Sequence, residues 1–285
     1  MKHCNVKLPR DIRKHVVLLP SFSLLLALAV SASMVTADGQ QSTSAPAIPV
    51  TGFPGLDQYR ASRVAVFTND FGQLARYRDA NAALEAPTRE EDRVIFFGDS
   101  ITDKWEIAES FPGKKYLNRG IGGQTTPQMI VRFRQDVIDL HPRVVIILAG
   151  TNDIAGNTGP MRLEDVEANY ASMAELAGAH NIKVIYSSVL PVNNYTPRSQ
   201  EFFAERSPEK ILALNRWLRN YCEPSSARDP APCSYLDYFS ALADKRGYLK
   251  KELSDDGLHP NAAGYKIMAP MAQSAIEQAL GPTKR

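Results

Sequence analysis

A serine stands directly after an apolar run that is typical of a buried β-strand. Residues 94–98 read Val-Ile-Phe-Phe-Gly, and Asp99 and Ser100 follow them. Apolar β-branched and aromatic residues that end at a glycine and a polar cluster predict a strand covered on both faces. In open parallel α/β sheets, chemistry takes place just beyond the carboxyl ends of the strands. Ser100 is therefore either a helix cap or a nucleophile.

A nucleophilic serine needs a base, because its hydroxyl alone is a poor nucleophile, and histidine suits that task near neutral pH. Of the five histidines, His3 and His15 lie in an N-terminal segment that we expect to be cleaved off. His141 and His180 stand at predicted helix ends, where an imidazolium complements the helix dipole, and are interpreted as structural. His259 remains, in a polar loop before the last predicted helix.

Two carboxylates precede His259 and could orient its ring. Asp256 stands three residues earlier with a glycine between, so that the loop can fold back, and Asp255 is the alternative. Either carboxylate could accept the Nδ1–H of the imidazole and fix its tautomer. The order Ser, Asp, His along the chain also occurs in other α/β serine hydrolases.

Acyl transfer also needs hydrogen-bond donors for the developing oxyanion. The backbone N–H of Ser100 is one candidate, and that of Gly123 is a second because a missing side chain lets a carbonyl approach closely. The side-chain amide of Asn152, after a predicted strand over 144–148, is a third. Each residue taken singly also fits a cap or a turn. Their joint presence at neighbouring strand ends favours a hydrolase site.

Predicted strands and helices alternate along the chain, which indicates a parallel sheet with helices on both faces. We therefore expect one three-layer α/β/α domain over residues 56–285. Besides the strand at 94–98, we expect strands at 115–118, 144–148, 183–188 and 235–238. We expect helices at 68–84, 103–110, from about 127 up to Pro142, and at 163–179, 208–221 and 261–280.

Residues 1–37 have the layout of a secretory signal peptide. Basic residues precede an apolar run over 16–30, and Val-Thr-Ala at 35–37 fits a cleavage site. A membrane anchor or a buried helix is the alternative, but the run is shorter than a bilayer span. Residues 38–55 are rich in Gln, Ser, Thr, Ala and Pro, which predicts a flexible linker. We expect a secreted or periplasmic protein with no stable membrane insertion.

The composition is that of a globular protein, with 44% apolar residues in a chain of 285. Loss of residues 1–37 would change the formal net charge from +2 to −2. Such a near-neutral chain gives no indication of a nucleic-acid partner, and nothing in it indicates an oligomeric state. Cys222 and Cys233 would remain as an even pair. An oxidising compartment would allow a disulfide between them, and two unpaired buried thiols are the alternative.

Four ordered blocks resemble those of the SGNH hydrolases, the GDSL-type esterases and lipases. They are Gly98-Asp99-Ser100-Ile101, Asn118-Arg119-Gly120-Ile121-Gly122-Gly123, Gly150-Thr151-Asn152-Asp153 and Asp256-Gly257-Leu258-His259-Pro260. The resemblance implies a flavodoxin-like parallel sheet and ester hydrolysis without a metal or a cofactor. It also implies a set formed by Ser100, Gly123, Asn152 and His259, with Asp256 behind the histidine. Ile101 departs from the usual leucine, and Gly122-Gly123-Gln124 stands where many members have Ser-Gly-Asp.

The blocks are most similar to the branch of acetylhydrolases and carbohydrate acetylesterases. This implies short acyl groups, acetyl above all, on a carbohydrate, small-molecule or lipid ester. A lysophospholipase or lipase is one alternative, and a secreted glycan- or lipid-binding module without turnover is another. Tyr195, Phe202 and Phe203 could line an acyl or sugar site, with ordinary loop packing as the alternative.

Two other kinds of site are a poor match to the sequence. The glycine loop at 120–123 lacks the G-x-G-x-x-G spacing and the lysine of nucleotide-binding loops. Asp256 and His259 have no further histidine near them in sequence to complete a zinc site. We therefore expect neither a nucleotide nor a metal at this edge of the sheet.

Overall fold

The computed structural model describes residues 51–88, 90–225 and 231–281, all of which lie in one compact unit. The expected signal peptide at 1–37 and most of the expected linker at 38–55 lie outside these residues. The first described helix, α1 (Pro54–Asn69), begins within the last residues assigned to the linker. No helix among the described residues is both long and apolar enough to cross a bilayer.

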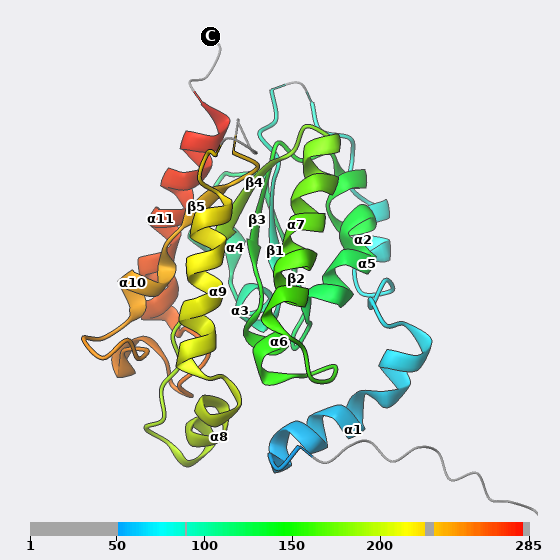
Figure 1. Cartoon of the computed structure of the whole chain (residues 1–285). Coiled ribbons are helices and arrows are strands. Elements are labelled where there is room, and N and C mark those ends of the chain that lie inside the picture. The colour runs from blue at the N-terminus through cyan, green and yellow to red at the C-terminus, as the bar shows by residue number, and fades with distance from the viewer. Residues whose placement is uncertain (1–50, 89, 226–230, 282–285) are drawn as a thin grey trace, which may run out of the picture. The chain divides into compact units, whose positions relative to one another are not determined.

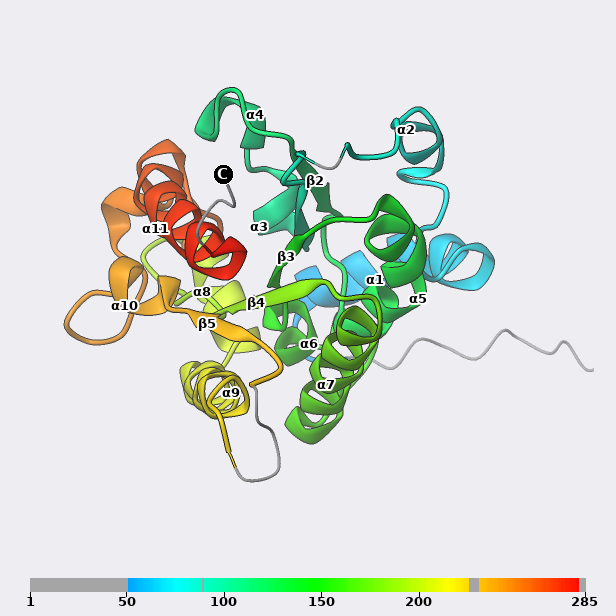
Figure 2. The same ribbon diagram turned by 90° about the horizontal axis from the view of Figure 1, so that it is seen from above.

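Five parallel strands form a single sheet in the order β2-β1-β3-β4-β5 (Figures 1 and 2). Their bounds are β1 Val94–Gly98, β2 Tyr116–Gly120, β3 Val144–Leu148, β4 Lys183–Ser187 and β5 Ser234–Leu236. This arrangement confirms the predicted α/β class and parallel sheet. The register places Gly98 of β1 beside both Gly120 and Leu148, so three strands end at the same level.

Helices cover both faces of the sheet, as Figure 2 shows. One core contains Ile95 and Phe97 together with side chains of α5 (Thr126–Asp136), α7 (Leu163–Ala179) and α9 (Pro208–Tyr221). The opposite core contains Val94, Phe96 and side chains of α4 (Ile107–Ser110), α10 (Tyr238–Leu242) and α11 (Ala262–Leu280). The alternation along β1 thus supplies an apolar side chain to each layer in turn.

The prediction of one helix over residues 68–84 is wrong. Helix α1 ends at Asn69, and the next helix, α2, covers only Arg78–Ala82. The side chain of Asp70 accepts hydrogen bonds from the backbone N–H groups of Leu74 and Ala75, and Gln73 has a φ of 54°. These side-chain bonds compete with helical hydrogen bonds, so a turn separates the two helices.

Other predicted boundaries shift or split. The helix expected at 103–110 is two helices, α3 (Ser100–Asp103) and α4, and the strand expected at 115–118 is β2. The bounds predicted for β3, α7 and α9 are those observed. Four helices were not predicted: α6 (Thr151–Ala155), α8 (Pro197–Glu205), α10, and α1 apart from its last two residues. Helices α6 and α8 follow strands at the carboxyl edge, where Figure 1 also shows α1.

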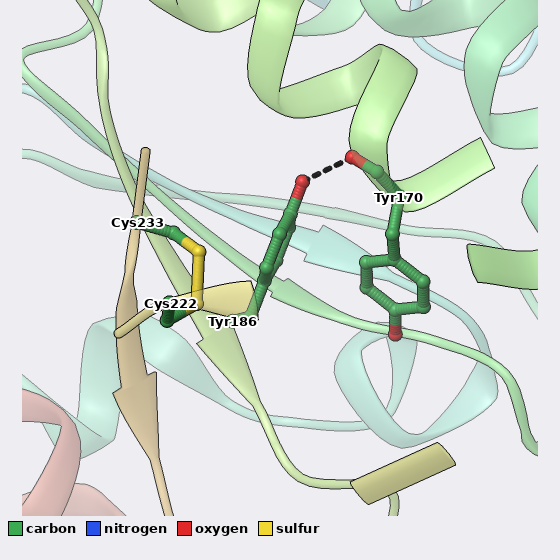
Figure 3. Close-up of a disulfide and its surroundings, with 4 residues drawn as sticks. All are labelled: Tyr170, Tyr186, Cys222 and Cys233. Atoms are coloured by element: carbon green, nitrogen blue, oxygen red, sulfur yellow. Dashed lines mark hydrogen bonds between the residues drawn. A yellow bond between two sulfur atoms is a disulfide. The ribbon is translucent and has the colours of Figure 1, made fainter. Parts of the chain in front are cut away.

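A disulfide ties the end of α9 to the edge strand β5. Cys222 is the C-cap of α9 and Cys233 directly precedes β5, and their sulfur atoms are bonded with the Cα atoms 4.8 Å apart (Figure 3). Both cysteines are buried. Nearby, the hydroxyl of Tyr186 on β4 donates a hydrogen bond to the backbone carbonyl of Tyr170 on α7. The disulfide thus holds β5 to α9, and the tyrosine hydrogen bond holds β4 to α7.

One fully buried guanidinium, that of Arg132 on α5, joins the ends of two strands. It donates hydrogen bonds to the backbone carbonyls of Gly98 and Arg119, at 3.0 and 2.9 Å, and to the side chain of Gln124 at 2.6 Å. Asp136 lies 3.0 Å away and is also fully buried. Burial lowers the pKa of Arg132 to about 10, although Asp136 opposes this shift, so the group is charged at neutral pH.

We predict that Arg132→Met lowers the free energy of unfolding by about 3–5 kcal/mol, because it leaves the Asp136 carboxylate buried without its charge partner. Urea unfolding followed by circular dichroism measures this change. Val131→Ala, one residue earlier on the exposed face of α5, is the matched control and should change stability by less than about 1 kcal/mol. Equal effects of the two substitutions would contradict the assignment of Arg132 as the anchor of this edge.

Candidate active site

Ser100, His259 and Asp256 form a continuous chain of hydrogen bonds at the carboxyl edge of the sheet. Ser100 Oγ lies 2.9 Å from His259 Nε2, and His259 Nδ1 lies 2.7 Å from Asp256 Oδ2. Ser100 is the first residue of α3, directly after β1, and His259 lies shortly before α11. The structure therefore brings together three side chains that are separated by up to 159 positions in the sequence.

The loop before α11 holds Asp256 in place through its backbone. Asp256 Oδ1 accepts hydrogen bonds from the N–H groups of Leu258 and His259, at 3.0 and 2.8 Å. Burial raises the pKa of Asp256, but the hydrogen bonds and the charge of His259 outweigh it and hold this pKa well below its usual range. Asp255, the alternative orienting carboxylate, instead accepts from Asn261 at 3.2 Å. Asp256 is therefore the carboxylate that contacts the imidazole.

Gly123 lies beside Ser100 in a conformation that favours glycine. Its φ is 80°, and a Cβ built on it would lie 2.1 Å from the hydroxyl oxygen of Tyr59. That hydroxyl donates to the Gly123 carbonyl at 3.2 Å, and the side chain of Asn157 donates to the same oxygen at 2.9 Å. The Gly123 N–H has no acceptor among the described residues. Its carbonyl is thus fixed while its N–H stays available.

The side-chain amide of Asn152 is oriented by two neighbours. Its Nδ2 donates to the backbone carbonyl of Gln124 at 3.1 Å, and its Oδ1 accepts from Arg206 Nη2 at 3.3 Å. An amide nitrogen carries two N–H groups, so one remains for another acceptor. Arg206 follows α8, is 4% exposed and pairs with the carboxylate of Glu205. Because the Arg206 guanidinium binds the amide oxygen, the amide nitrogen is the end that faces Gln124.

A cavity of about 280 Å³ opens above these groups. Ser100, Gly123, Asn152 and His259 line its floor. Its walls come from α1, the C-cap of α3, the loops after β2 and α6, the segment of α8 and its C-cap, and the residue before His259. The wall residues are Gly55, Leu56, Tyr59, Arg63, Lys104, Gly122, Asn157, Arg198, Glu201, Phe202, Glu205, Arg206 and Leu258. The structure thus places every residue proposed for the reaction except Asp256 on one cavity surface.

Apart from Phe202, the wall residues on α1 and α8 were not predicted from the sequence. The carboxylate of Glu201 on α8 accepts a hydrogen bond from the Gly55 N–H at the start of α1. Arg60 on α1 donates to the backbone carbonyl of Gly156, after α6. The sequence does carry a signal for the start of these helices. Each has a proline at its first position, and Thr196 caps α8. These contacts hold both helices against the carboxyl edge.

Among the three aromatic residues considered for the wall, only Phe202 lines the cavity. The hydroxyl of Tyr195 accepts from the Gly257 N–H at 3.0 Å and donates to the carbonyl of Ser254, so it supports the loop of Asp256. Phe203 packs against Tyr248 with ring centroids 5.0 Å apart. Loop packing is thus the observed role of two of the three.

Two buried carboxyl groups lie beneath the site. Burial raises the pKa of Asp99 to about 7, with a further contribution from Asp153, whose own pKa burial raises to about 6. Asp99 Oδ1 accepts from the Ile101 N–H at 2.9 Å and so caps α3. Asp153 accepts from the N–H and hydroxyl of Thr126 and so ties α6 to α5. Both carboxyl groups therefore hold helices in place at the carboxyl edge of the sheet.

The remaining histidines lie at helix ends, as predicted. His141 follows a 3₁₀ turn over Ile138–Leu140, and His180 is the C-cap of α7. Both are exposed. No cluster of three His, Cys, Asp or Glu side chains able to hold a metal occurs among the described residues.

A parallel α/β sheet with a Ser-His-Asp arrangement at its carboxyl edge is the architecture of a class of hydrolases. A sequence model of the GDSL-like Lipase/Acylhydrolase family matches residues 96–267, and the chain belongs to this family. The matched segment runs from β1 into α11 and includes Ser100, Gly123, Asn152, Asp256 and His259. It excludes α1. Membership of this family supports an ester-hydrolysing activity.

Two crystal structures of Bacteroides proteins are similar over their whole length. A protein of Bacteroides fragilis assigned to the acylhydrolases is 38% identical, covers 75% of this chain and 100% of its own, and has a TM-score of 0.68. A GDSL-like lipase of Bacteroides thetaiotaomicron is 39% identical, with 74% and 100% coverage and a TM-score of 0.66. Both likenesses agree with the family assignment.

A curated relative is the uncharacterized lipoprotein YqeF of Bacillus subtilis. It is 30% identical over 132 residues, which is 40% of this chain. The chain spans about half the length of this relative, 54%. The likeness therefore covers only part of both proteins.

We predict that Gly123→Ala lowers kcat by about 10- to 100-fold on an acetyl ester, because a side chain there combines a positive φ with a clash against Tyr59. Gly122→Ala is the matched control. A Cβ at Gly122 would meet only Asp103 at 3.6 Å and Ser100 at 3.8 Å, which are ordinary contacts. Kinetics of both variants, together with their melting temperatures, test this. A Gly123→Ala variant as active as Gly122→Ala would contradict the assignment.

Proposed function

We propose that this protein is a serine esterase that removes short acyl groups, acetyl above all, from a carbohydrate or another small ester. Ser100 is the nucleophile, His259 the general base, and Asp256 the carboxylate that orients it. The observation that carries the proposal is the pair of contacts at 2.9 and 2.7 Å that links these three side chains at the floor of the cavity.

The reaction proceeds in two halves. As Ser100 Oγ attacks the ester carbonyl carbon, His259 Nε2 takes its proton, and Asp256 stabilises the imidazolium that forms. His259 then gives this proton to the departing alcohol, which leaves an acyl group on Ser100. In the second half a water molecule attacks the acyl carbon in the same way, and the carboxylic acid leaves as Ser100 regains its proton. No metal or cofactor takes part in this scheme.

Three donors stabilise the negative charge on the carbonyl oxygen. Ser100 starts α3, so its N–H has no acceptor within the helix. Gly123, whose N–H has no acceptor among the described residues, and Asn152, whose amide keeps a second N–H, line the same cavity. Donors that are fixed before the reaction cost no reorganisation when the charge develops. Arg206 contributes by holding Asn152 Oδ1 away from the oxyanion.

Several features support export and a small acyl site. The Cys222–Cys233 disulfide fits an oxidising compartment, and one relative is a lipoprotein. Together with the signal-peptide pattern at residues 1–37, these support a secreted or periplasmic location. The cavity of about 280 Å³ is at the small end for ligand pockets, which favours a short acyl chain over a long one.

We predict that Ser100→Ala lowers the hydrolysis of p-nitrophenyl acetate by more than about 1,000-fold while the melting temperature stays close to that of the wild type. Activity should be highest on acyl chains of about two to four carbons in a series of p-nitrophenyl esters. A peak at about ten carbons or more would favour the lysophospholipase or lipase alternative. A wild type inactive on every ester would favour a binding module with this fold.

A second prediction concerns Arg206, which we place as a positioning residue that acts through Asn152. Asn152→Ala should lower kcat by about 100- to 1,000-fold with little change in KM. Arg206→Met should also lower kcat, because the amide is no longer held in one orientation. In an Asn152→Ala background, however, Arg206→Met should have almost no further effect, since the group it positions is absent.

The double-mutant cycle distinguishes positioning from a general structural role. Arg206→Lys, which keeps a donor and the positive charge beside Glu205, should recover part of the lost kcat. Losses that multiply in the double variant would show that Arg206 does not act through Asn152. An Asn152→Ala variant with full kcat would instead remove Asn152 from the oxyanion hole.

A further inference from the structure

Three cationic side chains line the cavity around Ser100 without a carboxylate partner. Arg63 comes from α1, Lys104 is the C-cap of α3, and Arg198 lies in the first turn of α8. Among the described residues, no carboxylate oxygen lies within 4.0 Å of the nitrogens of these side chains. The three charges thus converge on one opening from three separate elements.

The two carboxylates in the same lining already have partners. Glu205 forms an ion pair with Arg206, and both side chains are about 5% exposed. Glu201 accepts the Gly55 N–H at the start of α1, where the helix dipole also favours a negative charge. Glu201 keeps its negative charge, because the N–H that it accepts is uncharged, and Arg198 also acts electrostatically on Glu205. The arginines and the lysine of the lining still outnumber its two carboxylates, so the opening carries a net positive charge that a ligand can neutralise.

The two arginines are also held in place against the cavity walls. The Arg63 guanidinium lies over the Tyr59 ring at 5.6 Å from its centroid, and that of Arg198 lies over Phe202 at 4.9 Å. Stacking of this kind is worth about 0.5–1 kcal/mol at an exposed site, so it favours this position of the guanidinium and leaves its N–H edge free to donate. A guanidinium edge matches the two oxygens of a carboxylate or phosphate group.

From this arrangement we propose that the enzyme selects esters whose alcohol portion carries a negative charge, and that Arg63, Lys104 and Arg198 bind that charge. The inference rests on the esterase function proposed above. The acyl group lies at Ser100, and the anionic group of the alcohol lies toward the cations at the opening. A carboxylate on an acidic sugar and the phosphate of a glycerol ester both meet this description.

The test uses two pairs of acetyl esters that differ only in charge. One pair is an O-acetylated methyl glucuronide and the corresponding O-acetylated methyl glucoside, and the other is acetylglycerol phosphate and acetylglycerol. Release of acetate gives kcat/KM for each ester. The measured quantity is the ratio of kcat/KM for the anionic ester to that for its neutral partner. Comparing this ratio between variants cancels the intrinsic reactivity of the esters.

We expect the wild type to prefer the anionic member of at least one pair by about tenfold, and the pair that shows it identifies sugar or phosphate as the source of the charge. Arg63→Gln and Arg198→Gln should each lower the ratio about threefold, and the double variant about tenfold. Raising the salt concentration from about 0.02 M to about 0.5 M should also lower the wild-type ratio, because salt screens the attraction between the ester and the cations.

Arg216→Gln is the matched control. Arg216 is an exposed residue of α9 outside the cavity lining, so its loss removes the same charge from the protein and should leave the ratio unchanged. Ratios near one for both pairs, or equal losses on charged and neutral esters, would overturn the proposal. Failure of the esterase function itself would look different, because no ester of either pair would then release acetate.

Discussion

The buried guanidinium of Arg132 is the interaction on which the geometry of the carboxyl edge depends. It binds the last carbonyl of β1, a carbonyl near the end of β2 and the side chain of Gln124, and Asp136 balances its charge. Ser100 follows the first of these strands and Gly123 follows the second. A single charged group thus links the strand end that carries the nucleophile to the strand end that leads to Gly123. A buried charge is costly unless it is paired and hydrogen-bonded, so these four hydrogen bonds favour one fixed arrangement of the edge.

The edge built in this way is completed by segments far apart in the chain. The loop before α11 brings Asp256 and His259 to Ser100, and α8 brings Arg206 to Asn152. Helix α1 lies outside the matched family segment, yet it contacts the Gly123 loop through Tyr59 and α8 through Gly55. The central strands therefore support the chemistry, while α1 and α8 shape the opening through which an ester enters. Their arginines give that opening its charge.

Much of this could be predicted from the sequence. The apolar run at 144–148 predicts β3 with its observed bounds. Elimination among the five histidines leaves His259 as the base, and this residue contacts Ser100. The two helices that shape the cavity were harder to predict. Helix α1 has almost no amphipathic periodicity, and α8 lies in a segment with few apolar residues. Arg206 was missed for a different reason. Its role depends on a tertiary contact with Asn152, and no local spacing encodes that contact.

Covalent labelling with a p-nitrophenyl phosphonate ester tests most directly whether Ser100 is the activated nucleophile. Mass spectrometry of the intact protein and its peptides then locates the label. Attack by an activated serine on phosphorus releases p-nitrophenolate and leaves a stable adduct. We expect one adduct per chain, located on Ser100, and much slower labelling in His259→Ala, because the base that activates the hydroxyl is then absent. Labelling at another residue, or labelling at Ser100 that does not depend on His259, would contradict the assignment of Ser100 as the nucleophile.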